Sequence, residues 1–358
     1  MSHISNNIPQ AGAALANYSG KEVINRVGED VIKQLVTSIL CGDNVRSLTE
    51  GLTRRRLAIS NASLLALFIK SVNNVDNFID QMPQLVKSEL LSGISKEKKL
   101  YLQWLVGLTG KSVQNVLRSD REEFDNYLQN YEKTLKESVE KCQIDIGPLN
   151  GTLKLEDTTC SLNWPFIIYL FAAIGSQTLA IRGSEKSLYG KLFEKLILGS
   201  VLTILGFKII NISDTESNNK VFWLSSRGSK RESDATLLFK PGVGARFDIG
   251  FIGPGNTEIS LDKVSRFERE MEHGRQIHYM STIILVDRIG DKSRIAEMAK
   301  AINGDIIQMS MTYWVKNACI ILNEKLGFKH ELMELSGPES LKYIQNKMKA
   351  VNLERFIL

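Results

Sequence analysis

Apolar residues recur at steps of three and four positions through most of the first 143 residues. This spacing places them on one face of a helix in KEVINRVGEDVIKQLVTSIL, SKEKKLYLQWLVGLTGKSVQNVLRS and REEFDNYLQNYEKTLKESVEKCQ. Residues 1–20 are small and polar, and they predict a disordered lead-in. Residues 144–163 contain a Pro-Leu-Asn-Gly turn and predict a hairpin. The pattern therefore indicates an all-helical N-terminal region over residues 21–163, which serves for dimerisation or as a DNA clamp.

The pattern changes after residue 163. We expect an apolar helix near 164–181 that stops at Gly183, and then a second helix that ends in a Gly-Phe turn and a strand. The runs VFWLSS and SDATLLFK predict strands, and residues 246–263 predict a pair of strands. Helices and strands then alternate: helix 264–280, strand STIILVD, helix 291–302, strand DIIQMSM, helix 313–326 and a helix ending near 350. This order predicts an α/β domain over residues 164–358 with a partly parallel sheet.

Composition narrows the class of protein only a little. The 358 residues suffice for two domains, and the net charge of +5 permits a nucleic-acid partner without requiring one. Four scattered cysteines and four histidines argue against a zinc site or a disulfide framework and fit a reducing compartment. The first residues lack the features of a signal peptide, and the most apolar run, Trp164 to Ile174, is shorter than a membrane span. We expect a cytoplasmic protein with no membrane partner.

Acidic residues interrupt the two apolar runs of residues 246–263. Asp248 lies in the first run and Glu258 in the second, a Gly-Pro-Gly-Asn turn joins them, and Lys263 follows. Hydrolysis of a phosphodiester needs an activated water and neutralisation of developing charge. Magnesium held by carboxylates provides both, and a lysine can assist. Magnesium-dependent cleavage of DNA is therefore the leading hypothesis.

Two further acids are candidates for the same site. Glu194 lies on an otherwise apolar row of its helix, where a bare carboxylate is costly to bury, so it is either bound at the site or paired with Lys191 or Lys195. Asp234 precedes the strand ATLLFK and is either a metal ligand or a turn residue. For Asp248 itself, the alternatives to binding a metal are a salt bridge with Arg246 and a role in the turn.

Two blocks of the chain resemble the PD-(D/E)XK nucleases, and within them the type II restriction endonucleases. GKLFEKLILGSVLTILGFKI looks like the core helix of that fold, and FDIGFIGPGNTEISLDK looks like its aspartate-strand, turn and acid-strand signature. The stretch RFDIGFIG…EISLDKVSRFERE most resembles the CfrBI-like restriction endonucleases, a family associated with a CCWWGG site. The resemblance implies a mixed sheet flanked by helices.

The resemblance also implies a site and partners. The catalytic residues would be Asp248, Glu258, Lys263 and Glu194, and the metal ligands Asp248, Glu258, Glu194 and Asp234. The cofactor would be Mg²⁺, for which Mn²⁺ can substitute. The substrate would be double-stranded DNA with a short palindromic site, which calls for a homodimer. A cognate DNA methyltransferase would protect the host. The alternatives are a nuclease of the same fold acting in repair or defence, and a non-catalytic DNA-binding α/β protein.

The chain departs from the family pattern at the lysine. The family places lysine two residues after the second acid, where this chain has Ser260, and Lys263 follows three residues later. In an unbroken strand, Lys263 would face away from Glu258. A four-residue loop would likewise put Asp248 and Glu258 on opposite faces. A three- or five-residue loop, a bulge at the glycines or a bent strand end would bring the two acids together. Lys263 can reach the site only if the strand ends or bulges near Asp262.

Basic residues next to the expected site predict contacts with DNA. Arg227, Lys230 and Arg231 lie in the loop SSRGSKRE, and Arg246 lies two residues before Asp248. They could hold phosphates or read guanine edges, although a solvated surface loop is the alternative. In the helical region, Arg54 to Arg56 offer a second DNA contact, the alternative being that the helices only pack or dimerise.

Overall fold

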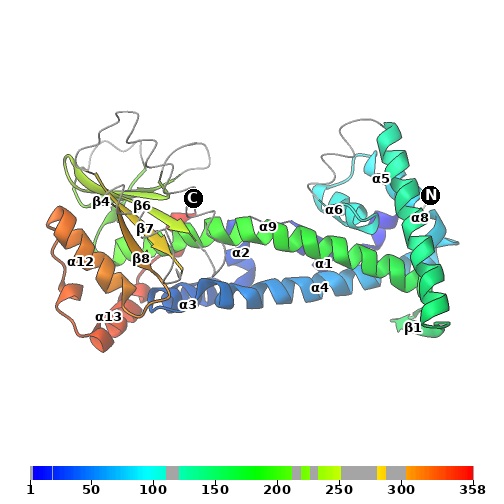
Figure 1. Ribbon diagram of the computed structural model, residues 1–358, viewed down its shortest axis with the longest axis horizontal. Coiled ribbons are helices and arrows are strands. Elements are labelled where there is room, and N and C mark those ends of the chain that lie inside the picture. Colours follow the sequence, from blue (N-terminus) through cyan, green and yellow to red (C-terminus); the bar gives the residue numbers. More distant parts are fainter. Residues whose placement is uncertain are drawn as a thin grey trace. The chain divides into compact units, whose positions relative to one another are not determined.

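The computed structural model of the chain describes residues 3–17, 19–109, 121–211, 219–225, 233–250, 280–287 and 304–357. The chain forms two compact units (Figure 1). The helical unit comprises Met1–Ser19 and Gly51–Ser187, and the sheet unit comprises Gly20–Glu50 and Leu188–Leu358. Each unit thus combines two separate segments of the chain, where the sequence predicted one N-terminal and one C-terminal region divided at residue 163.

The helical unit is organised around an aromatic core. The Phe68 ring meets the rings of Phe78 and Phe166 edge-on, each at a centroid distance of 5.7 Å. The expected hairpin is confirmed: β1 (Gly151–Leu155) pairs antiparallel with β2 (Thr158–Leu162). The helices that contribute to this unit are η1 (Ile4–Asn7), α1 (Gln10–Ala16), α4 (Val45–Asn74), α5 (Phe78–Leu90), α6 (Lys96–Leu105), α8 (Arg121–Asp145) and α9 (Trp164–Ile204).

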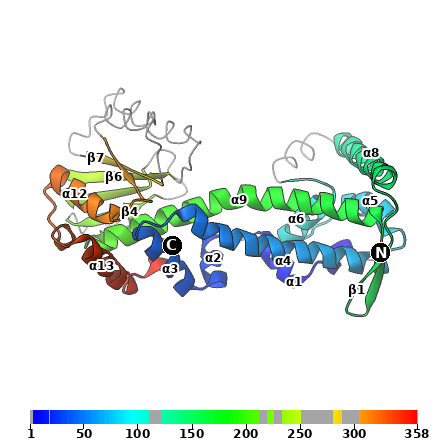
Figure 2. The same ribbon diagram turned by 60° about the horizontal axis from the view of Figure 1, so that its bottom comes forward.

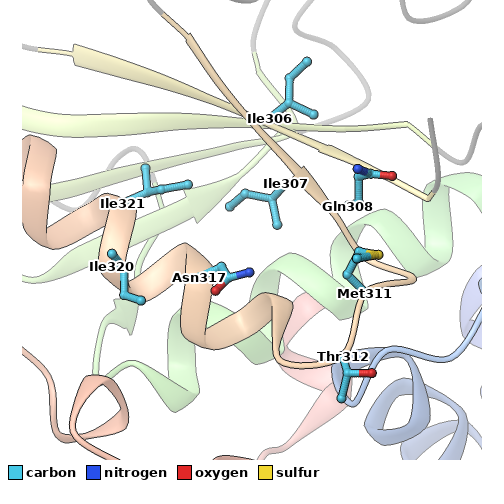
Figure 3. Close-up of a pocket in the computed structure, with 8 residues that line it drawn as sticks. All are labelled: Ile306, Ile307, Gln308, Met311, Thr312, Asn317, Ile320 and Ile321. Atoms are coloured by element: carbon cyan, nitrogen blue, oxygen red, sulfur yellow. The ribbon is translucent and has the colours of Figure 1, made fainter. Parts of the chain in front are cut away.

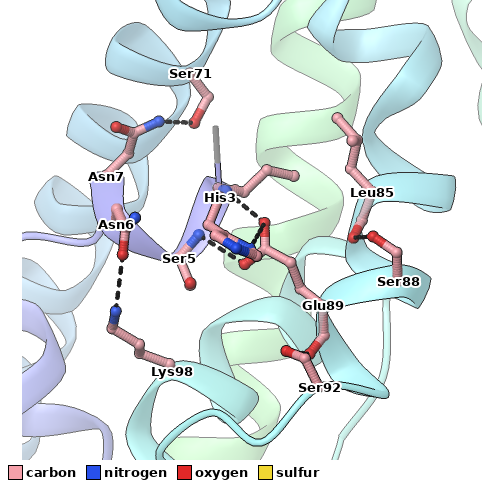
Figure 4. A network of polar contacts seen from close by, with 11 residues as sticks. His3, Ser5, Asn6, Asn7, Ser71, Leu85, Ser88, Glu89, Ser92 and Lys98 are labelled. Carbon is pink, nitrogen blue, oxygen red and sulfur yellow. Dashed lines mark hydrogen bonds and ion pairs between the residues drawn. The ribbon is translucent and has the colours of Figure 1, made fainter. Parts of the chain in front are cut away.

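The first residues of the chain are tied into this unit, which differs from the expected disordered lead-in. The backbone amides of Ile4 and Ser5 both donate to the carboxylate of Glu89, which is only 4% exposed (Figure 4). Asn7 Nδ2 donates to Ser71 Oγ at 3.0 Å, and Ile4 itself is fully buried. Two backbone amides at the start of η1 thus donate hydrogen bonds to a carboxylate that would be costly to bury without them.

Arg56 has a structural role in the helical unit. Its side chain is 4% exposed, and its Nε and Nη2 donate to the carbonyl oxygens of Leu15 and Ala16 at 2.9 and 3.1 Å. Arg54 and Arg55 are exposed on the same helix, because consecutive helical residues point in different directions. The suggested DNA contact is therefore excluded for Arg56 and stays a prediction for the other two.

α9 is continuous through Gly183, where the sequence predicted a helix stop. Glycine inside a helix costs only about 1 kcal/mol relative to alanine. Packing offsets this cost on both sides of the glycine, since Phe166 and Leu170 are buried in the helical unit and Phe193 and Leu196 are buried in the sheet unit. Burial of α9 on both sides of Gly183 therefore outweighs the tendency of this glycine to end the helix.

By length and composition alone, α9 could cross a membrane, since it has 41 residues with a strongly apolar first half. This differs from the expectation that no apolar stretch is long enough to do so. The core helix of a soluble protein meets the same criteria. Within the first half of α9, Phe166, Leu170 and Ala173 are buried in the core of the helical unit, whereas Phe171 and Leu179 are exposed.

The sheet unit contains a six-stranded mixed sheet in the order β3-β4-β5-β6-β7-β8. β3 pairs parallel with β4. β4 pairs antiparallel with β5, and β5 pairs antiparallel with β6. β6, β7 and β8 run parallel to one another. The strands are β3 (Lys208–Ile209), β4 (Val221–Leu224), β5 (Ala235–Lys240), β6 (Val243–Gly250), β7 (Met280–Val286) and β8 (Gly304–Gln308). This sheet, flanked by helices, confirms the predicted α/β class.

Helices from both ends of the chain complete the sheet unit. They are α2 (Gly20–Val27), α3 (Glu29–Leu40), α12 (Trp314–Leu326), η2 (Glu331–Met333), α13 (Gly337–Lys349) and η3 (Leu353–Phe356). α12 packs against β6 and β8, and Figure 2 shows it alongside the strands. The buried indole Nε1 of Trp314 donates to the carbonyl oxygen of Ile39 at 2.8 Å. This bond ties α3 to α12 within the sheet unit.

The strands predicted from VFWLSS, SDATLLFK, STIILVD and DIIQMSM are confirmed as β4, β5, β7 and β8, and α12 confirms the helix over 313–326. The helix expected over 264–280 lies outside the described residues except for Met280, which begins β7. The helix expected over 291–302 and the second arm of the strand pair also lie outside them.

Two glycines of α9 should respond oppositely to alanine. A Cβ at Gly199 would lie 2.5 Å from the Phe356 ring, whereas a Cβ at Gly183 would meet nothing within 4 Å. We expect Gly199→Ala to destabilise the protein by about 1–3 kcal/mol through overpacking. Gly183→Ala should stabilise it by about 0.5–1 kcal/mol through helix propensity. Denaturant unfolding measures both, and destabilisation by Gly183→Ala would contradict an uninterrupted α9.

Candidate active site

The candidate site is built on β6, which has a neighbour on each edge. β5 pairs with it antiparallel from Val243 to Phe247, and β7 pairs with it parallel from Gly244 to Gly250. We expected the Glu258 strand as the hairpin partner of the Asp248 strand. Along the described part of β6 the partners are β5 and β7. Glu258 lies outside the described residues, so its pairing with the Asp248 strand stays a prediction.

Alternation along the strands gives the sheet two chemically different faces. The pairs Ala235–Phe247 and Phe247–Ile283 fix which side chains share a face. One face is apolar, and its members are at most 2% exposed: Ala235, Leu237, Ala245, Phe247, Ile249, Ile283 and Leu285. The opposite face, here called the polar face, includes Asp234, Thr236, Arg246, Asp248 and Thr282. The apolar face anchors the strands. The polar face also carries the buried Ile284 and Val286 of β7, so its acids lie beside an apolar surface.

Asp234 and Asp248 lie directly opposite each other on the polar face. The β5–β6 register that pairs Ala235 with Phe247 brings Asp234 level with Asp248 one step further on. The backbone of Asp234 still belongs to the sheet, because Ser225 N donates to its carbonyl oxygen at 3.0 Å. Asp234 Oδ2 accepts the backbone N–H of Ile249 at 2.9 Å and so fixes the peptide that follows Asp248.

This pair of carboxylates suits a divalent cation. Asp248 is 2% exposed and Asp234 is half-buried. Carboxylates facing each other across two strands repel, and burial adds to the cost, whereas a shared cation offsets both. Magnesium sites commonly use one or two carboxylates together with phosphate oxygens and waters, so the donor set fits. Within the part of the chain that the structure describes, no group of three or more His, Cys, Asp or Glu side chains is arranged to hold a metal.

The remaining predicted residues divide into two sets. Glu194 lies half-buried in α9 beside the buried Phe193, and Arg246 lies half-buried on the polar face. The others fall outside the described residues: Glu258, Lys263, Arg227, Lys230 and Arg231. The structure thus brings Asp234, Asp248 and Arg246 onto one face, while the roles of the other residues stay predictions.

Sequence reasoning missed one buried acid near the site. Asp287 directly follows β7, is 3% exposed, and accepts hydrogen bonds from Asn44 Nδ2 and Ser310 Oγ at 2.6 and 2.7 Å. The available signal was an aspartate at the end of the apolar run STIILV, since the carboxyl ends of parallel strands collect functional groups.

A cavity of about 470 Å³ lies between β8 and α12 (Figure 3). Its lining is mainly apolar and contains no acid: Ile306, Ile307, Gln308, Met311, Thr312, Asn317, Ile320 and Ile321. It therefore lacks the carboxylates that magnesium sites commonly use.

The cysteines are free thiols. Burial raises the pKa of Cys319 to about 12, and desolvation also raises the pKa of Cys41 and Cys160. These three thiols are therefore protonated at neutral pH and poor nucleophiles or metal ligands.

Comparison with known proteins identifies the family. The model of the CfrBI restriction endonuclease family matches residues 29–294. Type II restriction enzyme CfrBI of Citrobacter freundii is 40% identical over 359 residues, which cover 98% of each chain. The chain belongs to the CfrBI restriction endonuclease family. No solved structure matches it.

Membership of the CfrBI restriction endonuclease family makes the chain an endodeoxyribonuclease, with DNA as its substrate class. Type II restriction endonucleases generally use divalent metal ions, in agreement with the paired carboxylates on the polar face. The matched range contains α4, α9 and the strands from β3 to β7, so the family resemblance includes the helical unit as well as the sheet.

Two substitutions at Asp234 should separate its charge from its hydrogen bond. Asp234→Asn keeps an acceptor for the Ile249 N–H, whereas Asp234→Ala removes both acceptor and charge. We expect both variants to lose cleavage by about a hundredfold or more. Only the alanine variant should lose stability, by about 1–2 kcal/mol. Cleavage assays and thermal unfolding measure the two effects. If Asp234→Asn cleaves DNA at the wild-type rate, Asp234 has no role in catalysis and only accepts the Ile249 hydrogen bond.

Proposed function

We propose that this endonuclease hydrolyses double-stranded DNA at a short palindromic site in a Mg²⁺-dependent reaction, for which Mn²⁺ can substitute. The observation that supports it best is the placement of Asp234 and Asp248 opposite each other on the polar face of β5 and β6. CCWWGG, the site associated with the CfrBI-like family, is the first sequence to test.

In this proposal the side chains of the polar face hold and orient the reactants. Asp248 and Asp234 bind the divalent ion, which when bound supplies water activation and charge neutralisation. The Ile249 N–H donates to Asp234 and keeps its carboxylate turned toward the end of β6. Arg246, two residues before Asp248 on the same face, offsets negative charge. Glu258 and Glu194 add further carboxylates.

The proposal also assigns roles to the residues around this pair. Lys263 orients the attacking water or offsets charge in the transition state. The basic residues of the loop between β4 and β5 bind DNA phosphates; they are Arg227, Lys230 and Arg231. Binding to phosphates makes affinity fall with salt, because condensed counterions are released when the complex forms.

The biological setting follows from the substrate. A palindromic site presents two equivalent strands, so a homodimer with one active site per strand matches its symmetry. Host DNA carries the same sites and needs masking by a cognate methyltransferase. A cytoplasmic location fits both the DNA substrate and the scattered free thiols.

Cleavage should depend on a divalent ion and on Asp248. Phage DNA incubated with the protein should give discrete bands with Mg²⁺ and none with EDTA. We expect Asp248→Asn to slow cleavage by about a hundredfold or more, because a ligand is lost. Its affinity for DNA in Ca²⁺ should change little, because phosphate contacts remain. Asp305→Asn is the matched control, since the Asp305 carboxylate pairs with Lys325 at 3.4 Å.

The patterns of cutting separate the alternatives. A smear would favour a nuclease of the same fold without sequence preference, and no cutting with any divalent ion would favour a DNA-binding protein without catalysis. Glu258→Gln tests whether the second acid of the motif is also required. If Asp248→Asn cleaves DNA at the wild-type rate, Asp248 is not a ligand of the catalytic metal ion.

A further inference from the structure

The α3–α4 turn meets the sheet at the end where its catalytic strand finishes. β6, β7 and β8 are parallel, so their carboxyl ends share one edge of the sheet. The register pairs Gly250 of β6 with Val286 of β7, and Val286 with Gln308 of β8. Asp287 follows Val286 and therefore lies at this edge, three residues beyond Ile284, the β7 partner of the proposed metal ligand Asp248.

The Asp287 carboxylate joins three segments of the chain. Its Oδ2 accepts from Asn44 Nδ2 at 2.6 Å, and its Oδ1 accepts from Ser310 Oγ at 2.7 Å. The backbone continues the contact, since Ser310 N donates to the Asp287 carbonyl oxygen at 3.0 Å. At 3% exposure this carboxylate depends on its donors, because a buried charge without hydrogen bonds is unstable. We call Asn44, Asp287 and Ser310 the edge clasp.

Asn44 also starts α4. Its Oδ1 accepts the backbone N–H of Ser47 at 3.1 Å, so the same side chain caps α4 and donates to Asp287. The adjoining turn fits closely, because a Cβ at Gly42 would lie 3.1 Å from backbone atoms of Met311 and Thr312. The start of α4 is therefore held to the carboxyl ends of β7 and β8 by specific bonds and by close packing.

We propose that Asp287 is a positioning residue for the catalytic strand. By holding the ends of β7 and β8 and the start of α4 together, the edge clasp keeps the end of β6 in register and Asp248 in place. The role needs an acceptor rather than a charge, since both partners of the carboxylate are neutral donors. The inference rests on the proposed function, in which Asp248 binds the metal ion.

An exchange of the two side chains tests the clasp. Asn44→Asp alone places two carboxylates where a donor and an acceptor met at 2.6 Å. Adding Asp287→Asn restores the pair with the donor reversed: the new amide donates to position 44 and still accepts from Ser310. The aspartate at position 44 can still accept from Ser47, as the asparagine does. Asp287→Asn alone should be mild, because its amide can donate to the Ser310 hydroxyl.

We expect Asn44→Asp to slow single-turnover cleavage by about tenfold and to raise the half-saturating Mg²⁺ concentration, because the ligand is misplaced. The double variant Asn44→Asp/Asp287→Asn should recover the rate to within about twofold, a coupling that only contacting residues show. Asp305→Asn serves again as the control. Thermal unfolding of the metal-free proteins should show the same loss and recovery in Tm.

Different failures have different meanings. If Asn44→Asp lowers Tm but cuts at the wild-type rate with an unchanged Mg²⁺ requirement, the clasp is structural and the positioning role is overturned. If the double variant recovers neither rate nor Tm, the two residues do not act as a pair. Absence of cutting by the wild-type protein would instead overturn the proposed function, and the positioning role would fall with it.

Discussion

Pairing of β6 along both of its edges is the constraint on which the rest of the site depends. β5 and β7 satisfy its backbone groups, and this fixes the direction of every side chain on the strand. Because alternate residues face opposite sides, the same pairing buries Phe247 and Ile249 on the apolar face and turns Asp248 to the polar face. A shift of one residue would turn Asp248 to the apolar face, so the packing of Phe247 and Ile249 fixes the direction of the acid.

In both units, carboxylates that are buried or half-buried accept hydrogen bonds from other segments of the chain. Glu89 gathers the amides at the start of η1, Asp234 takes the amide after Asp248, and Asp287 takes donors from Asn44 and Ser310. In each case a carboxylate links two or more separate segments of the chain. Such bonds are directional and costly to break, because the partner groups would be left buried without hydrogen bonds. Because they are directional, these bonds fix the position of segments that apolar packing alone would not place uniquely.

Much of the element pattern could be predicted because it depends on local spacing. The strands β4, β5, β7 and β8 and the β1–β2 hairpin follow from short apolar runs bounded by turn residues. Gly183 was misleading, because burial of α9 in both units outweighs the weak helix propensity of a single glycine. The lead-in was misleading for a similar reason: its order comes from Glu89, which is more than 80 residues away in the chain.

The sequence by itself determined the family resemblance and the α/β class and proposed Asp248 as a site residue, because these depend on residue types and short-range periodicity. The tertiary structure alone decided that Asp234 lies opposite Asp248, that Arg56 is buried, and that residues 20–50 belong with the sheet. The physical reason is that strand register and long-range hydrogen bonds join positions whose separation along the chain has no fixed relation to their separation in space. Neighbouring acids in a motif are therefore easier to find than neighbouring acids in a fold.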